Sequence, residues 1–181
     1  MCFAVTAFVR VALPAPPPRV LEVGAGNGEL AAALAHAGYE MVAVDPASES
    51  PNVRAVPLHE LDEPPRSFDA AVAVVSLHHV QPLEESCRHL GELVRPGGVL
   101  VIDEFDVERF DERAARWLID ARGPTLEEGR RDPAALVAEL REHLHSLARI
   151  RDALEAWFLV GEPVRGPYLY RWDLPPGLRE P

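Results

Sequence analysis

A glycine-rich turn between a short apolar segment and an alanine- and leucine-rich segment constrains this fold more than any other feature. The turn is Gly24-Ala-Gly-Asn-Gly28. Residues 19–23 before it have the composition of a strand, and residues 29–37 after it have helical spacing closed by Gly38. A strand that passes through a glycine turn into a helix is the first half of a βαβ unit. The pattern predicts an α/β protein.

The alternation of strand-like and helix-like segments continues along the chain. Residues 70–75 are continuously apolar, which is typical of a parallel strand covered on both faces. A helix is predicted from Pro82 to about Val94, followed by a turn at Arg95-Pro-Gly-Gly98. The other predicted strands are 40–44, 53–56 and 99–103. Right-handed connections between such strands give a doubly wound, mainly parallel sheet.

The second half of the chain has a different pattern. Helical spacing from Phe110 to Leu118, with Trp117 on its apolar face, predicts one helix. Asp132-Pro133 is an N-cap signal for another helix, which we expect to run to about Leu147. Residues 157–164 and 168–172 alternate like strands across a short turn and predict an antiparallel hairpin at the sheet edge.

Charge and composition narrow the class of protein. The 181-residue chain has a net charge of -11 with no Lys, which argues against an electrostatic nucleic-acid binder. It contains no apolar run of the roughly 20 residues that a membrane helix needs. Cys2 and Cys87 have no metal-type spacing, and we expect them to be idle thiols of a cytoplasmic protein without a metal site.

Two acidic residues beside the glycine turn favour a ligand with a cationic end. The turn nominally fits a dinucleotide fingerprint, but Glu22 precedes it and Glu29 opens the helix. A pyrophosphate binds at a helix N-terminus that is free of competing anions, so these two acids disfavour it. Asp45 ends the next strand, where a carboxylate can accept bonds from both hydroxyls of a ribose. The combination describes S-adenosylmethionine better than NAD. Capping of a neighbouring turn is the alternative role for Glu22.

Longer stretches of the sequence match a known pattern in order and spacing. They are Val20–Gly28, Val42–Pro46, Phe68–Val80 and Leu93–Val101. On these stretches, which lie within residues 19–104, the chain resembles the class I S-adenosylmethionine-dependent methyltransferases, in particular small bacterial members. The resemblance implies a Rossmann-like fold, which here would have seven strands, mainly parallel, with a C-terminal antiparallel hairpin.

The resemblance also implies which residues bind S-adenosylmethionine. Gly24 and Gly26 would line its methionine and ribose portions, Glu22 would act at the amino-acid end, and Asp45 would hold the ribose hydroxyls. The acid that usually binds the adenine amino group is absent from residues 56–61, where His59 and Glu60 are the candidates. The implied cofactor residues are Glu22, Gly24, Ala25, Gly26, Asp45, Pro46, Leu58, His59, Ser76 and Leu77.

Two residues near the predicted methyl end are candidates for catalysis. His79 follows the fourth predicted strand and is our first choice for a general base, which typically contributes ~10²–10⁴-fold. Shaping the site through a hydrogen bond to a neighbouring loop is the equal alternative. Glu104 follows the fifth strand and would either orient the acceptor or cap the segment after it. His143 and His145, two apart on a predicted continuous helix, would not chelate one metal ion.

We therefore expect a methyltransferase that acts on a small molecule, with the methylated atom undefined. The alternatives are a non-catalytic S-adenosylmethionine-binding protein and, less favoured, an NAD(P)-dependent oxidoreductase. Residues 1–18 form an N-terminal segment with a proline-rich hinge, and residues 19–181 form the domain, with a helical insertion at about 107–150. Because little chain precedes the domain, the helices after Phe110, a second subunit in a homodimer or an upstream segment must cover the site.

Overall fold

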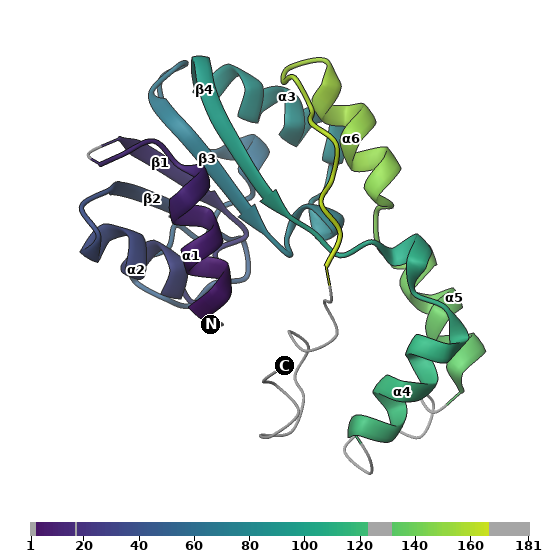
Figure 1. The fold of residues 1–181 in the computed structure, drawn as a ribbon. Helices are drawn as coiled ribbons and strands as arrows, with labels where there is room; N and C mark the ends of the chain where they lie inside the picture. Colours follow the sequence, from purple (N-terminus) through teal and green to yellow (C-terminus); the bar gives the residue numbers. More distant parts are fainter. Residues whose placement is uncertain (1–2, 17, 123–131, 167–181) are drawn as a thin grey trace. The chain divides into compact units, whose positions relative to one another are not determined.

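The computed structural model describes residues 3–16, 18–122 and 132–166 and shows an α/β fold (Figure 1). Its contacts divide the chain into two units. Residues 1–104 and 148–160 form the first, and residues 105–147 and 161–181 form the second. The first unit contains α1 (Phe3–Ala12), β1 (Arg19–Val23), α2 (Glu29–His36), β2 (Glu40–Val44), β3 (Phe68–Val74), α3 (Leu83–Leu93), β4 (Val94–Asp103) and most of α6 (Leu147–Glu155).

The sheet of the first unit has the order β2-β1-β3-β4, and every pair is parallel. The strands at 19–23 and 40–44 have the predicted bounds, and the strand predicted at 99–103 lies within β4. The strand predicted at 70–75 overlaps β3, which begins two residues earlier and ends at Val74. The expected seven strands are wrong for the described residues, which form four. Residues 53–56 contribute only one bridge, between Arg54 and Val44.

The predicted C-terminal hairpin is not formed by the residues that the structure describes. The predicted strand 157–164 begins as a turn, because the backbone N–H groups of Trp157 and Phe158 both donate to the Leu154 carbonyl at 2.9 Å. The rest of that segment is irregular, and residues 168–172 lie outside the described residues.

The predicted turn at residues 95–98 is instead an irregularity inside β4. Val94 pairs with Phe68 and Val99 pairs with Ala70, so the extra residues bulge out of the ladder. Gly97 has a φ of 78°, and a Cβ at Gly98 would lie 2.8 Å from the Asp69 carbonyl oxygen. The glycines thus permit a bulge and a close approach to β3, where turn composition alone had predicted a strand end.

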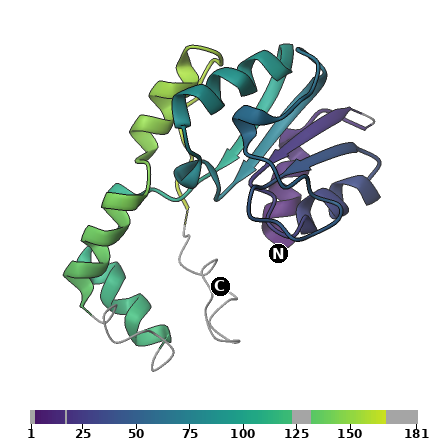
Figure 2. The same ribbon diagram turned by 180° about the vertical axis from the view of Figure 1, so that it is seen from behind.

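Helices cover both faces of the sheet and bury alternate residues of its strands (Figures 1 and 2). Val20 and Val72 pack with α1 and α2, whereas Leu21 and Ala73 pack with α3 and α6. Helix α1 buries Val5 and Val9, and the buried Leu13, which directly follows α1, continues their helical spacing. Residues 3–12 therefore belong to a layer of the core.

The fifth helix begins at its predicted cap but ends earlier than predicted. Asp132 caps α5 (Pro133–His143) as predicted, accepting a 3.0 Å hydrogen bond from the Ala134 N–H. Helix α5 ends at His143, earlier than the predicted Leu147, and the separate helix α6 was not predicted. In the second unit α5 packs against α4 (Glu112–Arg122), and Trp117 is exposed rather than in the core.

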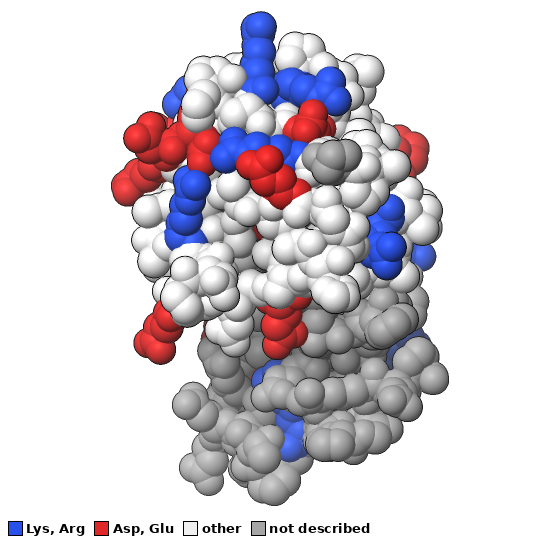
Figure 3. All heavy atoms as spheres, turned by 90° about the vertical axis from the view of Figure 1, so that its left-hand side faces the viewer, with Lys and Arg blue, Asp and Glu red and all other residues white. Residues whose placement is uncertain are grey.

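On the face seen in Figure 3, basic side chains stand next to acidic ones and form no continuous basic stripe. No helix within the described ranges has the length and apolar character that crossing a membrane requires. Cys87 is buried, and burial followed by the charge of Glu84 raises the pKa of its thiol to about 11.

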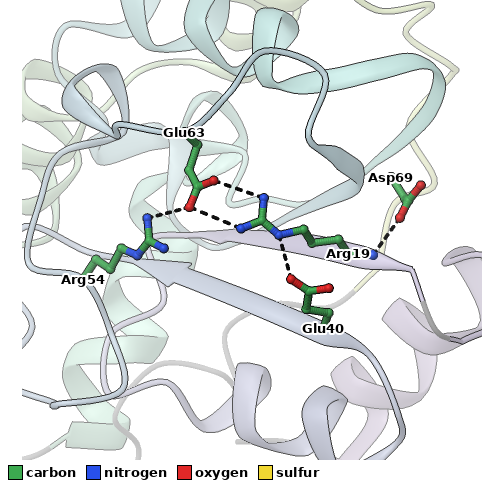
Figure 4. A network of polar contacts seen from close by, with 5 residues as sticks. All are labelled: Arg19, Glu40, Arg54, Glu63 and Asp69. Atoms are coloured by element: carbon green, nitrogen blue, oxygen red, sulfur yellow. Dashed lines mark hydrogen bonds and ion pairs between the residues drawn. The ribbon is translucent and has the colours of Figure 1, made fainter.

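Arg19, the first residue of β1, belongs to a network of ion pairs and hydrogen bonds (Figure 4). The guanidinium of Arg19 donates to both oxygens of Glu63, at 3.1 and 3.3 Å, and Glu63 also pairs with Arg54 at 2.8 Å. The side chain of Glu63 is only 8% exposed. Its hydrogen bond with Arg19 is the main reason that its pKa lies below the ordinary value.

Candidate functional site

The carboxyl ends of the four parallel strands bring the predicted site residues to one edge of the sheet. Val23 pairs with Val44 on one side and with Ala73 on the other, and Val74 pairs with Asp103. The residues that follow these strands therefore share the edge at which ligands bind in open α/β sheets. They are Gly24, Asp45, Ser76 and Glu104.

The glycine turn after β1 is folded tightly against its neighbours. Gly24, Gly26 and Gly28 all have left-handed φ values, of 68°, 54° and 79°. The N–H groups of Gly24 and Ala25 donate to the Val44 carbonyl at 2.9 and 3.1 Å. A Cβ at Gly26 would meet no atom within 4 Å, so the backbone there is open to a ligand.

Asp45 links the end of β2 to this turn. Its Oδ2 accepts a hydrogen bond from the Gly26 N–H and its Oδ1 from the Ala47 N–H, both at 2.9 Å. Ser48, which the sequence did not single out, donates from its hydroxyl to the Gly26 carbonyl at 2.6 Å. Since each carboxylate oxygen has two lone pairs, Asp45 retains acceptor capacity on both oxygens for a pair of adjacent hydroxyls.

Glu22 is a buried acid in the middle of the sheet. The residue is 3% exposed, and its Oε2 has no hydrogen-bond partner among the described residues. Burial raises the pKa of this carboxyl to about 7, while a hydrogen bond with the Ala31 backbone acts in the opposite direction. A buried carboxylate with an unsatisfied oxygen fits a cationic group, such as the ammonium of S-adenosylmethionine.

The loop after β3 lies directly against the glycine turn. The Ser76 hydroxyl donates to the Val23 carbonyl at 2.8 Å, and the Leu77 side chain is fully buried. Val75 has a φ of 51°, an outlier for a β-branched residue that costs on the order of 1–3 kcal/mol. Such strain persists only where surrounding contacts fix the backbone.

The two histidines of this loop differ in exposure. His78 is buried, and its Nδ1 lies 2.5 Å from Glu104 Oε2. His79 is exposed, and its ring centroid lies 4.2 Å from that of His78. Glu104 therefore contacts His78 and not His79, the histidine that the sequence favoured. The only sequence signal for this contact was that both residues follow predicted strands.

The predicted adenine side is formed by a short loop and a single helical turn. No helix joins Asp45 to Arg54 within this described segment. Pro46 is exposed, whereas the Leu58 side chain belongs to the core. His59 Nδ1 is buried without a partner among the described residues, and its Nε2 lies 3.6 Å from Glu60.

His143 and His145 belong to the second unit. Helix α5 ends at His143, so the two residues do not share a continuous helix, and His145 is buried beyond the helix end. His143 Nδ1 contacts the Glu139 carbonyl at 2.8 Å. In the described part of the chain, no three His, Cys, Asp or Glu side chains are grouped so that they could hold a metal ion.

The chain is similar to curated O-methyltransferases, although it spans less than two thirds of their length. The ubiquinone biosynthesis O-methyltransferase of Xanthomonas campestris pv. campestris is 36% identical over 110 residues, which cover 51% of this chain and 44% of that protein. The protein of that name from Azorhizobium caulinodans is 27% identical over 172 residues, covering 83% of this chain and 65% of that protein.

A solved structure and a family model agree with this similarity. A putative methyltransferase from an antibiotic biosynthesis pathway of Anabaena variabilis superposes with a TM-score of 0.60 at 22% identity, covering 84% of this chain and 60% of that chain. This likeness concerns the fold alone. The family model described as a methyltransferase domain matches residues 3–157, well over half of the chain. The chain therefore belongs to the class I methyltransferase domain family, whose methyl donor is S-adenosylmethionine.

Proposed function

We propose that this chain is an S-adenosylmethionine-dependent methyltransferase that acts on a small molecule. The observation that carries the proposal is the 2.9 Å hydrogen bond between the Gly26 N–H and Asp45 Oδ2. It joins an open stretch of glycine backbone to a carboxylate that keeps acceptor capacity on both oxygens. When bound, S-adenosylmethionine supplies an electrophilic methyl group on a sulfonium.

The residues of the turn and of β2 would hold the nucleoside part of the cofactor. Asp45 accepts hydrogen bonds from the two ribose hydroxyls, and Gly26 allows the ribose to approach the backbone. Gly24 and Ala25 line the same turn, held by the Val44 carbonyl. Pro46 contacts the adenine, with the backbone of Leu58 and the ring of His59 beyond it.

The buried Glu22 would bind the cationic end of the cofactor, with Ser76 and Leu77 lining the methionine portion. Its unsatisfied Oε2 gains a charged partner when the ammonium is bound, directly or through a water molecule. The same carboxyl disfavours an anionic pyrophosphate, which supports S-adenosylmethionine over NAD. Ionisation of Glu22 is therefore coupled to binding.

His79 is the proposed general base for an acceptor that must lose a proton. It is exposed and belongs to the loop that follows β3, where an acceptor can reach it without displacing core residues. The names of the curated relatives favour a hydroxyl acceptor. A net charge of -11 favours a small molecule over a nucleic acid.

We infer in addition that a second copy of the chain covers part of the cofactor site, in a homodimer. Helix α1 buries Val5 and Val9 in the core, so within the described residues it forms a layer on the sheet and does not cover the site. A monomer at all concentrations in analytical ultracentrifugation would exclude the second copy.

Turnover on an acceptor mixture tests the function. The purified chain is incubated with S-adenosylmethionine and a fractionated metabolite extract, and the release of S-adenosylhomocysteine is measured by mass spectrometry. We expect release that depends on one or a few fractions. Binding of S-adenosylmethionine without release from any fraction would support a non-catalytic binding protein instead.

A further inference from the structure

Glu104 lies immediately after β4 and contacts three successive residues of the loop after β3. Its Oε1 accepts hydrogen bonds from the N–H groups of Ser76 and Leu77, at 2.8 and 2.5 Å. Its Oε2 lies 2.5 Å from His78 Nδ1. The side chain of Glu104 is only 1% exposed, so its carboxylate is committed to the loop rather than directed to solvent.

The loop that Glu104 holds is strained at its first residue. Val75 is in the left-handed region at a φ of 51°, and its N–H donates to the Asp103 carbonyl at 2.7 Å. Val74 ends β3 in register with Asp103. The left-handed turn at Val75 presents the next two N–H groups to the carboxylate of Glu104, and that carboxylate in turn maintains the unfavourable backbone.

The position of the loop determines the position of Ser76 against the glycine turn. The Ser76 hydroxyl donates to the Val23 carbonyl, and Ser76 Cβ occupies the space beside Gly24. A shift of the loop therefore moves one wall of the glycine turn. This relay connects Glu104, at the end of β4, to the end of β1 across β3.

The contact between Glu104 and His78 bears on which nitrogen of His78 carries the proton. An ionised carboxylate only accepts hydrogen bonds, so an ionised Glu104 places the proton of the short contact at Oε2 on His78 Nδ1. A carboxylate that fixes the tautomer of a neighbouring imidazole is a recognised way to orient it.

We propose that Glu104 is a positioning residue of the methyltransferase site. It keeps the loop 75–79 in its strained conformation and His78 in the Nδ1–H form, and it acts on the cofactor through Ser76 and the glycine turn, without contacting the reacting atoms. The inference rests on the proposed function for its effect on cofactor binding, but its structural part stands independently.

The first test is the tautomer of His78, measured by ¹⁵N NMR of histidine-labelled protein in the wild type and in Glu104→Gln. Glutamine preserves the shape and can still accept from the two N–H groups, but its amide NH₂ then faces His78 Nδ1. We expect Nδ1–H in the wild type and Nε2–H in the variant, with the Ser76 and Leu77 amides still protected from hydrogen exchange. An unchanged tautomer would overturn the inference. Neither readout requires a ligand.

The second test is the affinity for S-adenosylhomocysteine, measured by calorimetry. We expect Glu104→Ala to bind at least tenfold more weakly and Glu104→Gln within about threefold of the wild type, since it keeps an oxygen for the loop. In Val75→Gly, glycine removes the strain. We expect it to restore part of the affinity when combined with Glu104→Ala.

The outcomes separate the two proposals. Wild-type affinity in Glu104→Ala, together with loss of methyl transfer, would make Glu104 a catalytic residue and overturn the positioning role. Absence of binding by the wild type, with the expected His78 tautomers, would overturn the proposed function and leave the structural role of Glu104 intact. If Glu104→Ala does not fold, the tautomer in Glu104→Gln decides.

Discussion

Ser76 occupies the space into which any side chain at Gly24 would point. A Cβ built at Gly24 would lie 2.3 Å from Ser76 Cβ, and the φ of Gly24 is 68°. The loop after β3 and the turn after β1 are thus packed together with no room for one additional carbon. Two independent reasons, steric and conformational, require glycine at this position.

This contact predicts unequal destabilisation by alanine substitutions at Gly24 and Gly26. Gly24→Ala should lower the free energy of unfolding by about 2–4 kcal/mol, because a clash is added to the cost of a left-handed φ. Gly26→Ala should cost only about 1 kcal/mol, since its Cβ would meet no atom within 4 Å. Urea unfolding measures both values.

The two glycine substitutions also separate an effect on stability from an effect on cofactor binding. Although Gly26→Ala leaves a folded protein, its methyl group projects into the open space that we assign to the ribose, so the affinity for S-adenosylhomocysteine should fall at least tenfold. Equal destabilisation by the two substitutions, or wild-type affinity in Gly26→Ala, would contradict this account of the turn.

Of the predictions for site residues, the one for Asp45 is the most directly open to refutation. Asp45→Ala should reduce the affinity for S-adenosylmethionine by about 10²-fold while leaving a folded protein, because hydrogen bonds to a charged group contribute about 1.5–3 kcal/mol each. Asp45→Asn, which retains one acceptor oxygen, should lose less. Calorimetry gives the affinities, and thermal melts show whether each variant is folded.

A matched control for Asp45 is Glu49, an exposed acid in the same loop. Glu49→Ala removes an equal charge from the neighbourhood without removing the proposed ribose ligand. Comparable losses in Asp45→Ala and Glu49→Ala would indicate a general electrostatic effect and would argue against a ribose contact.

Glu22 predicts an unusual pH dependence of stability in the absence of ligand. Its pKa rises from 4.5 to about 7 on folding, because burial penalises the charged form. The protonated form is favoured by the folded state, so its contribution is complete below pH 4.5 and is lost as pH rises through about 7. The rise corresponds to about 3 kcal/mol at most.

Glu22→Gln supplies the control. The amide does not titrate, so the loss of stability between pH 4.5 and 7 should disappear from urea unfolding curves. The affinity of the wild type for S-adenosylmethionine should increase as pH rises through 7, because ionised Glu22 pairs with the ammonium. A pH-independent affinity would show that Glu22 does not contact the cationic end.

The lowered pKa of Glu63 predicts the opposite dependence of stability on pH. Its pKa is lowered, mainly by the hydrogen bond with Arg19, so its contribution to stability is present above its ordinary pKa and is lost as pH falls through the lowered value. Glu63→Gln should cost about 1–3 kcal/mol near pH 7 and flatten the acid limb of the stability profile.

A surface ion pair provides the comparison for Glu63. Glu92 pairs with Arg88 at 2.7 Å, but both side chains are more than 40% exposed, and such pairs contribute about 0.3–0.5 kcal/mol. Glu92→Gln should therefore change the unfolding free energy by less than 0.5 kcal/mol. An equal cost for the two substitutions would contradict a structural role for the Arg19–Glu63–Arg54 cluster.

The sequence was most informative where one local signal determines one local structure. The strand at 19–23, the helix after the glycine turn and the Asp132 cap each depend on neighbouring residues, and the structure has all of them. The strands predicted at 53–56 and 157–164 were wrong, because apolar composition alone does not supply a hydrogen-bonding partner strand.

The contacts between strand ends were harder to predict. Asp45 and Glu104 were recognised as candidates by position, but the sequence does not show that Asp45 binds the Gly26 N–H or that Glu104 reaches the loop at 76–78. These contacts depend on the register of β1 against β2 and of β3 against β4, which only the folded sheet defines.

The measurement that tests the central claim most directly is a calorimetric titration of the purified chain with S-adenosylmethionine and, separately, with NAD. We predict saturable binding of S-adenosylmethionine, much weaker binding in Asp45→Ala, and no measurable binding of NAD. Binding of NAD in preference to S-adenosylmethionine, or no affinity of a folded chain for S-adenosylmethionine, would contradict the proposed function.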